Sequence, residues 1–125
     1  MHRALFATVG VFVGVIGLIL LLIPGSYIEV YAVAYDPNMT FAARRFAPAL
    51  IGLAAILLLA RTLPTGPFLS TLCLISAIVF LLVATTGVNA WATGVAKPAI
   101  LYAAALEVAI AALFLWAART TNAKQ

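Results

Sequence analysis

One acidic residue, Glu107, lies within an otherwise apolar run and is the strongest candidate functional residue in the sequence. If residues 98–118 form a membrane-spanning helix, Glu107 is about nine residues from its start, or ~13 Å deep at 1.5 Å per residue. An ionisable side chain at that depth is costly and usually faces a partner, a cavity or water. Three roles stay open for Glu107. It could be a structural residue, protonated or paired within the bundle; part of a polar pocket for a quinone, lipid or small amphiphile; or a proton or cation relay in a transporter.

Four other charged residues are expected near the same end of the protein as Glu107. Arg44 and Arg45 lie near the start of another apolar segment, and Glu29 and Asp36 lie in the connection before it. The long arginine side chains could reach inward to Glu107 or outward to the other two acids. We therefore predict a polar pocket or an ion-pair network formed by these five residues.

The other reactive residue types exclude several kinds of site. A single cysteine, Cys73, cannot form an internal disulfide, and a single histidine, His2, cannot supply two axial ligands to a haem. No set of side chains has metal-ligand spacing or forms a nucleophile–base pair. The basic residues are scattered, whereas nucleic-acid binding needs a clustered basic face. The sequence therefore predicts no metal, no cofactor, no catalytic residue and no nucleic-acid partner, and an enzyme is the least favoured class.

The composition places these residues in an integral membrane protein. Of 125 residues, 66% are hydrophobic, only seven are Lys or Arg and three are Asp or Glu, and the mean hydropathy is +1.22. Such a chain cannot build a water-soluble surface. Four apolar segments approach the ~20 residues that cross a bilayer, and they cover residues 4–23, 41–60, 68–88 and 98–118. The predicted fold is a single all-α domain over residues 1–125, an integral membrane four-helix bundle.

Four spans place both termini on one side of the membrane. Basic residues are slightly more numerous on that side: Arg3, Arg61, Arg119 and Lys124 against Arg44, Arg45 and Lys97. By the positive-inside rule, we expect both termini in the cytoplasm. Trp91 and Trp116 would then lie in the two aromatic belts at opposite membrane faces.

The segment at residues 24–37 is too short to span and too apolar for an ordinary loop. As a helix it would place Tyr27, Tyr31 and Tyr35 on one face, and Glu29 and Asp36 on another. We favour a short helix at the membrane interface, with tyrosines at headgroup depth, over an extended hairpin-like segment. It would serve either as a lid or as the mouth of a site.

Three glycines, Gly10, Gly14 and Gly17, recur along the first span. Small residues let membrane helices approach closely. We expect this face to pack within the bundle; a homodimer is the alternative.

The layout resembles the DoxX-like superfamily, and more narrowly a branch of small bacterial four-helix membrane proteins. The residues that carry the likeness are Leu22-Ile23-Pro24 and the segment from Arg45 to Gly52, RFAPALIG, within a four-span layout that covers nearly the whole chain. At most, the resemblance implies an association with quinone or terminal-oxidase chemistry.

Together these patterns predict a small inner-membrane accessory or interaction protein with a lipid- or quinone-binding pocket near its outer face. The pocket should open between the second and fourth spans, with Arg44 or Arg45 at its rim. Expected partners are membrane lipid, a quinone or small amphiphile, and a larger membrane complex or further copies of the chain. The alternative is a small transporter or channel subunit that uses Glu107.

Overall fold

The computed structural model describes residues 1–122, with the backbone alone for Asn122. Lys124, one of the basic residues expected on the side of the termini, lies outside the described residues. Four of its five helices are long and apolar enough to cross a membrane, which confirms the predicted all-α bundle with four spans. The helices are α1 (His2–Leu22), α2 (Pro24–Tyr31), α3 (Asn38–Ala60), α4 (Pro67–Ala92) and α5 (Ile100–Asn122).

Proline and glycine define most of the helix boundaries. Pro24 and Pro67 occupy the first turns of α2 and α4, where the missing N–H group has no helical partner to lose. Gly94, with φ of 77°, makes the turn that follows α4, because glycine adopts this left-handed conformation without steric strain. Only α3 contains a proline in its interior, Pro48, and the helix continues through it.

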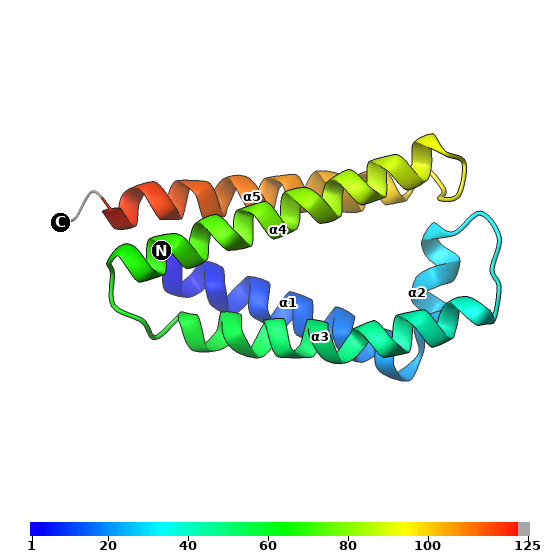
Figure 1. Cartoon of the computed structure of the whole chain (residues 1–125), viewed down its shortest axis with the longest axis horizontal. Helices are drawn as coiled ribbons and strands as arrows, with labels where there is room; N and C mark the ends of the chain where they lie inside the picture. Colours follow the sequence, from blue (N-terminus) through cyan, green and yellow to red (C-terminus); the bar gives the residue numbers. More distant parts are fainter. Residues whose placement is uncertain (123–125) are drawn as a thin grey trace.

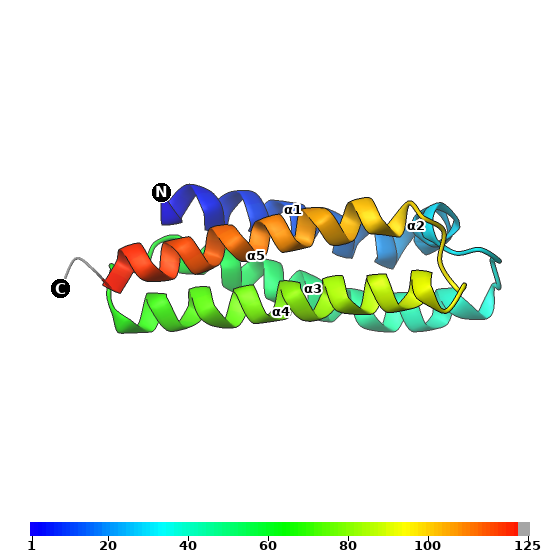
Figure 2. The same cartoon turned by 90° about the horizontal axis from the view of Figure 1, so that it is seen from above.

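The four long helices form two antiparallel pairs, α1 with α3 and α4 with α5 (Figure 1). All four run along the long axis of the molecule, and the start of α1 and the end of α5 lie at the same end, the terminal end (Figure 2). The two pairs meet at this terminal end and diverge toward the opposite end, so that the molecule has the shape of a wedge (Figure 1).

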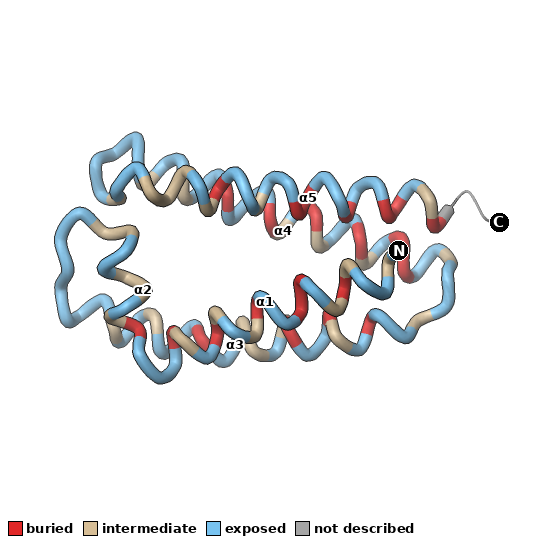
Figure 3. Tube along the Cα trace, turned by 180° about the vertical axis from the view of Figure 1, so that it is seen from behind, coloured by how far each residue is buried: buried red, intermediate tan, exposed pale blue. Residues whose placement is uncertain are grey.

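The hydrophobic core lies where the two pairs meet. The Phe114 ring of α5 contacts Phe6 of α1 edge to face, with centroids 5.2 Å apart, and stacks on Phe80 of α4 at 6.2 Å. The Ser70 hydroxyl donates a buried hydrogen bond to the Ala118 carbonyl and links α4 to α5. Buried residues occupy the faces that the helices turn toward one another, whereas the outward faces are exposed, as expected for surfaces in contact with lipid (Figure 3).

At the diverging end, α2 stands between the two pairs (Figure 1). The helix ends at Tyr31 because Ala32 adopts an extended conformation and pairs with Ala96 in the α4–α5 loop. The favoured interpretation of this segment as a helix therefore holds for residues 24–31, and the extended alternative holds at Ala32. The predicted helical tyrosine face includes Tyr27 and Tyr31 only.

Two backbone hydrogen bonds connect the end of α2 and the residues after it to the α4–α5 loop. The Val33 N–H donates to the Val95 carbonyl at 3.1 Å, and the Lys97 N–H donates to the Tyr31 carbonyl at 2.6 Å. The Lys97 ammonium also donates to the Glu29 carbonyl at 2.8 Å. We call residues 31–33 and 95–97 the strap, because they connect the two helix pairs at the diverging end.

Candidate functional site: a cavity between the helix pairs

A cavity of about 430 Å³ lies between the two helix pairs, beyond the aromatic core. Its volume is within the range of small-molecule sites in proteins. All five helices contribute to its lining, which consists of Phe12, Val13, Ile16, Leu20, Tyr27, Phe46, Ala49, Leu50, Leu53, Val79, Phe80, Val83 and Glu107.

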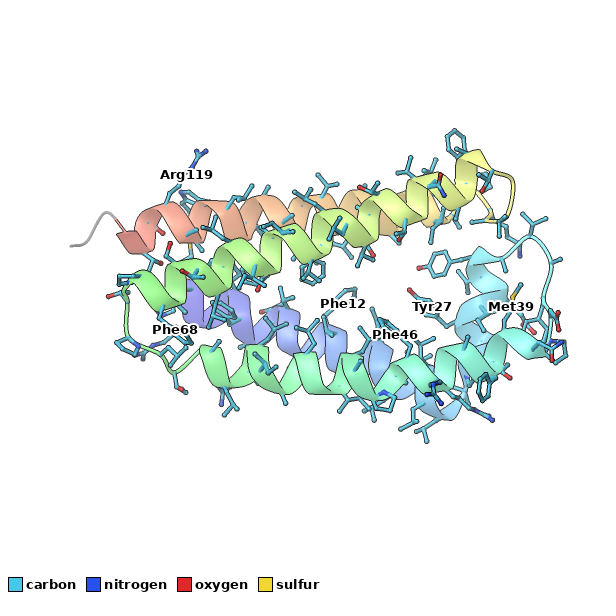
Figure 4. All side chains as sticks on the ribbon, viewed as in Figure 1. Phe12, Tyr27, Met39, Phe46, Phe68 and Arg119 are labelled. Carbon is cyan, nitrogen blue, oxygen red and sulfur yellow. The ribbon has the colours of Figure 1, made fainter. Side chains whose placement is uncertain are left out.

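The spacing of the apolar lining residues follows from helical geometry. Phe12, Ile16 and Leu20 recur every four residues and share one face of α1. The α3 lining residues, among them Phe46 and Leu50, share a face for the same reason. Phe12, Tyr27 and Phe46 reach into the space between the pairs from three different helices (Figure 4). These side chains make the walls of the cavity suitable for hydrocarbon.

Tyr27 and Glu107 are the two lining residues with polar side chains. Burial, the neighbouring Tyr31 and the carboxylate of Glu107 raise the pKa of Tyr27 to about 12, burial having the largest effect. The Tyr27 hydroxyl therefore keeps its proton at physiological pH and can donate a hydrogen bond. Among the described residues, neither Tyr27 nor Glu107 makes a side-chain hydrogen bond or an ion pair. Both groups are available to a bound molecule.

The structure does not bring the arginines to this cavity. Arg44 and Arg45 are exposed and do not belong to its lining. At about 100° per residue, Arg44 lies nearly opposite the face of α3 that carries Phe46 and Leu50, and Arg45 lies at the edge of that face. The periodicity of α3 thus explains why its charged residues are separated from the carboxylate of Glu107.

The other two predicted acids also lie outside the cavity. Glu29 is exposed on α2, and its backbone carbonyl accepts the Lys97 hydrogen bond of the strap. Asp36 is exposed before α3, where its carboxylate accepts a 2.9 Å hydrogen bond from the Asn38 N–H. Over the part of the chain that is described, no ion pair joins any of the five predicted residues. Only Glu107 of that set belongs to the cavity.

The glycine face of α1 is covered by α3 within the chain. A Cβ atom added at Gly10 would lie 2.9 Å from Leu58 Cγ, and one at Gly17 would lie 2.9 Å from Ile51 Cγ1. At Gly14 the corresponding contact is 3.4 Å, to Ala54 Cβ. Close approach of α1 and α3 therefore requires glycine at two of the three positions.

The predicted interfacial aromatics lie at both ends of the bundle. Trp91 is exposed at the end of α4 near the strap, and Trp116 is exposed on α5 toward the terminal end. Tyr27 and Tyr31 contact each other on α2, with ring centroids 5.0 Å apart. Tyr35 folds back over α2, where its hydroxyl lies 3.2 Å from the position of a Cβ on Gly25.

No sequence pattern identifies Tyr27 as the second polar residue of the cavity beside Glu107. The spacing of the tyrosines indicates a helix. It does not indicate that this helix lies between the two pairs (Figure 1), because that position depends on the contacts of the strap. Within residues 1–122, no three His, Cys, Asp or Glu side chains come together in a group that could hold a metal ion.

Comparison of the chain with protein-family models, with curated protein sequences and with solved structures found no match.

Proposed function

We propose that this chain is an accessory protein of a bacterial inner membrane, with both termini in the cytoplasm, that binds one amphiphilic molecule in the cavity between its helix pairs. One observation carries the proposal. The cavity is apolar on nearly all sides and presents two polar side chains, Tyr27 and Glu107, that have no hydrogen-bonding partner among the described residues.

An amphiphile satisfies both parts of this lining. Its hydrocarbon would lie against the aliphatic and phenylalanine side chains, and its polar head would bind the hydroxyl of Tyr27 and the carboxyl of Glu107. Polar groups removed from water are costly unless they are hydrogen-bonded. A head group that pairs with both residues would therefore be favoured over pure hydrocarbon.

The chemical class includes lipids with a small head group and quinones. The likeness to the DoxX-like superfamily is in keeping with a quinone, and the absence of a nucleophile–base pair in the sequence favours a binding role over catalysis. In this proposal the protein holds the amphiphile for a larger membrane complex.

The test uses a phenol that carries a photoreactive diazirine next to its ring, with the full chain in lipid nanodiscs. Ala49 lines the cavity, so Ala49→Trp should abolish labelling of cavity peptides. Ala55 is also exposed on α3 but does not line the cavity, and Ala55→Trp is the matched control that should retain labelling. Equal labelling of cavity peptides in wild type and both variants would refute the proposal.

A second candidate function, proton-coupled transport, is favoured by the Glu107 carboxyl, which lines the cavity without an ion-pair partner among the described residues. It predicts pH-driven flux in reconstituted vesicles that Glu107→Gln abolishes. Flux that is unaffected by this substitution would exclude it.

A further inference from the structure

A groove of about 500 Å³ lies between α1 and α5. These two helices are on the side of the molecule that faces the viewer in Figure 3, and they make few contacts with each other. The groove runs toward the terminal end, where Trp116 contributes to its lining. Apart from Thr8, its side chains carry no hydroxyl or charged group, and Trp116 supplies an indole.

The groove adjoins the cavity at Phe12, which lines both. On α1, the groove residue Val9 and Phe12 are one turn apart. On α5, the groove residues Leu106 and Ile110 flank Glu107, which lines the cavity. The two spaces thus meet at one level of the bundle, and the partly exposed Phe12 side chain lies between them.

We propose that the groove between α1 and α5 holds the hydrocarbon tail of the amphiphile whose head lies in the cavity, and that the tail passes Phe12. This inference rests on the proposed function and deepens it, because it assigns the ligand to a class: a small hydrogen-bonding head with one long apolar tail.

The dimensions and the chemistry of the groove agree with that class. Along α5, Glu107 and Trp116 are nine residues apart, which corresponds to about 13 Å at 1.5 Å per residue. That length suits a long chain rather than a methyl or ethyl group. Because the groove and the cavity meet at Phe12, one tail can extend from one space into the other. The cavity of about 430 Å³ limits the size of the head. The ligand would reach the cavity from the bilayer, since the groove residues Phe12, Leu113 and Trp116 are exposed on helices that are long and apolar enough to cross a membrane.

Two phenol probes with dodecyl tails test the inference, with the full chain in nanodiscs. The first carries its diazirine beside the ring, and the second carries it at the end of the tail. The first should label cavity peptides of α3 and α4, and the second should label groove peptides around Leu113 and Trp116. Excess unlabelled dodecylphenol should suppress both.

Matched variants of α1 sharpen the test. Thr8 lines the groove and Val11 lines neither space, although both are exposed. Thr8→Phe should cause loss of groove labelling by the second probe, while the first probe still labels the cavity. Val11→Phe should leave both patterns as in wild type. Phe12→Ala, which removes the side chain between the two spaces, should increase tail labelling of the groove.

The outcomes separate this inference from the proposed function. Head labelling of the cavity with tail labelling spread over all lipid-facing helices would overturn the inference alone. Head labelling that does not respond to Ala49→Trp would overturn both. Chain-to-chain cross-links from a photoreactive residue at Leu113, in place of tail labelling, would show that a second copy fills the groove and would also overturn it.

Discussion

At the scale of single residues, the site depends on a tyrosine and a glutamate from helices that are far apart in the sequence. Tyr27 comes from the short helix α2, and Glu107 comes from α5. A phenol that keeps its proton is a hydrogen-bond donor, and a carboxyl group accepts hydrogen bonds in either protonation state. The pair can therefore hold a head group that has both donor and acceptor atoms.

The raised pKa of Tyr27 predicts a specific dependence on pH. Because burial, and to a smaller extent Tyr31 and Glu107, raise this pKa from 10.0 to about 12, the folded state holds the tyrosine proton more tightly than the unfolded state does. The resulting stability is present below pH 10 and is lost as the pH rises toward 12. Absorbance titration of the full chain in detergent should show a tyrosinate step near pH 12.

Tyr27→Phe should remove that step and reduce the loss of stability between pH 10 and 12. Tyr102→Phe is the control, because Tyr102 is 83% exposed. A late step that persists in Tyr27→Phe would assign the raised pKa to another tyrosine.

At the scale of helices, two features hold the parts of the wedge together. Glycines on α1 let α1 and α3 approach closely, so this pair stays together along its length. The strap connects the diverging ends of the two pairs through backbone hydrogen bonds and Lys97. The cavity lies between the core and the strap, where α2 stands between the two pairs (Figure 1).

The glycine packing can be tested by adding one methyl group. Gly17→Ala would place its Cβ 2.9 Å from Ile51 Cγ1 and 3.3 Å from the Ile51 nitrogen, and overpacking of this kind destabilises proteins by about 1–3 kcal/mol. Gly52→Ala is the matched control, because a Cβ there meets no atom within 4 Å. Its helix should gain about 1 kcal/mol from the better propensity of alanine.

Reversible unfolding in mixed micelles measures both changes. A Gly17→Ala protein as stable as the Gly52→Ala protein would contradict the close packing of α1 on α3.

The strap can be tested through Lys97. Lys97→Met removes the hydrogen bond to the Glu29 carbonyl, which is worth about 1 kcal/mol and thus about fivefold in the opening equilibrium. Amide hydrogen exchange of residues 32–33 and 95–97 should accelerate accordingly. Arg119→Met, at the other end of the bundle, should leave these amides unchanged. Unaltered exchange in Lys97→Met would show that the backbone bonds alone close the strap.

At the scale of the whole molecule, the sequence predicted the four spans well, and of the five predicted charged residues only Glu107 lines the candidate site. Apolar length and Pro/Gly boundaries are local signals, and a membrane helix satisfies its own backbone hydrogen bonds, so the spans can be recognised one by one. Glu107 was recognisable because a carboxylate is rare inside an apolar segment.

The five charged residues do not come together, because their positions depend on how the helices associate. Pairing of α1 with α3 and of α4 with α5 depends on side-chain fit between segments that are distant in sequence, and apolar segments give little sign of their partners. In the resulting arrangement Arg44 lies on the face of α3 opposite the cavity. Tyr27, on the helix that the strap connects to the α4–α5 loop, lines the cavity, and the arginines do not. Contacts of this kind have no local signature.

The shape of the wedge bears on the proposed ligand. Its closed end is a packed aromatic core, and its open end is bridged by α2 and the strap, so in our proposal the ligand enters the cavity from the bilayer rather than from water. This arrangement is suited to molecules that are dissolved in the membrane.

Native mass spectrometry of the full chain, released from its own membranes in mild detergent, tests the central claim most directly. We predict one bound amphiphile in the wild type and in Ala55→Trp, and none in Ala49→Trp, whose indole would occupy part of the cavity and leave too little room for the ligand. The same bound mass in all three proteins, or no bound mass in any of them, would contradict a ligand site between the helix pairs.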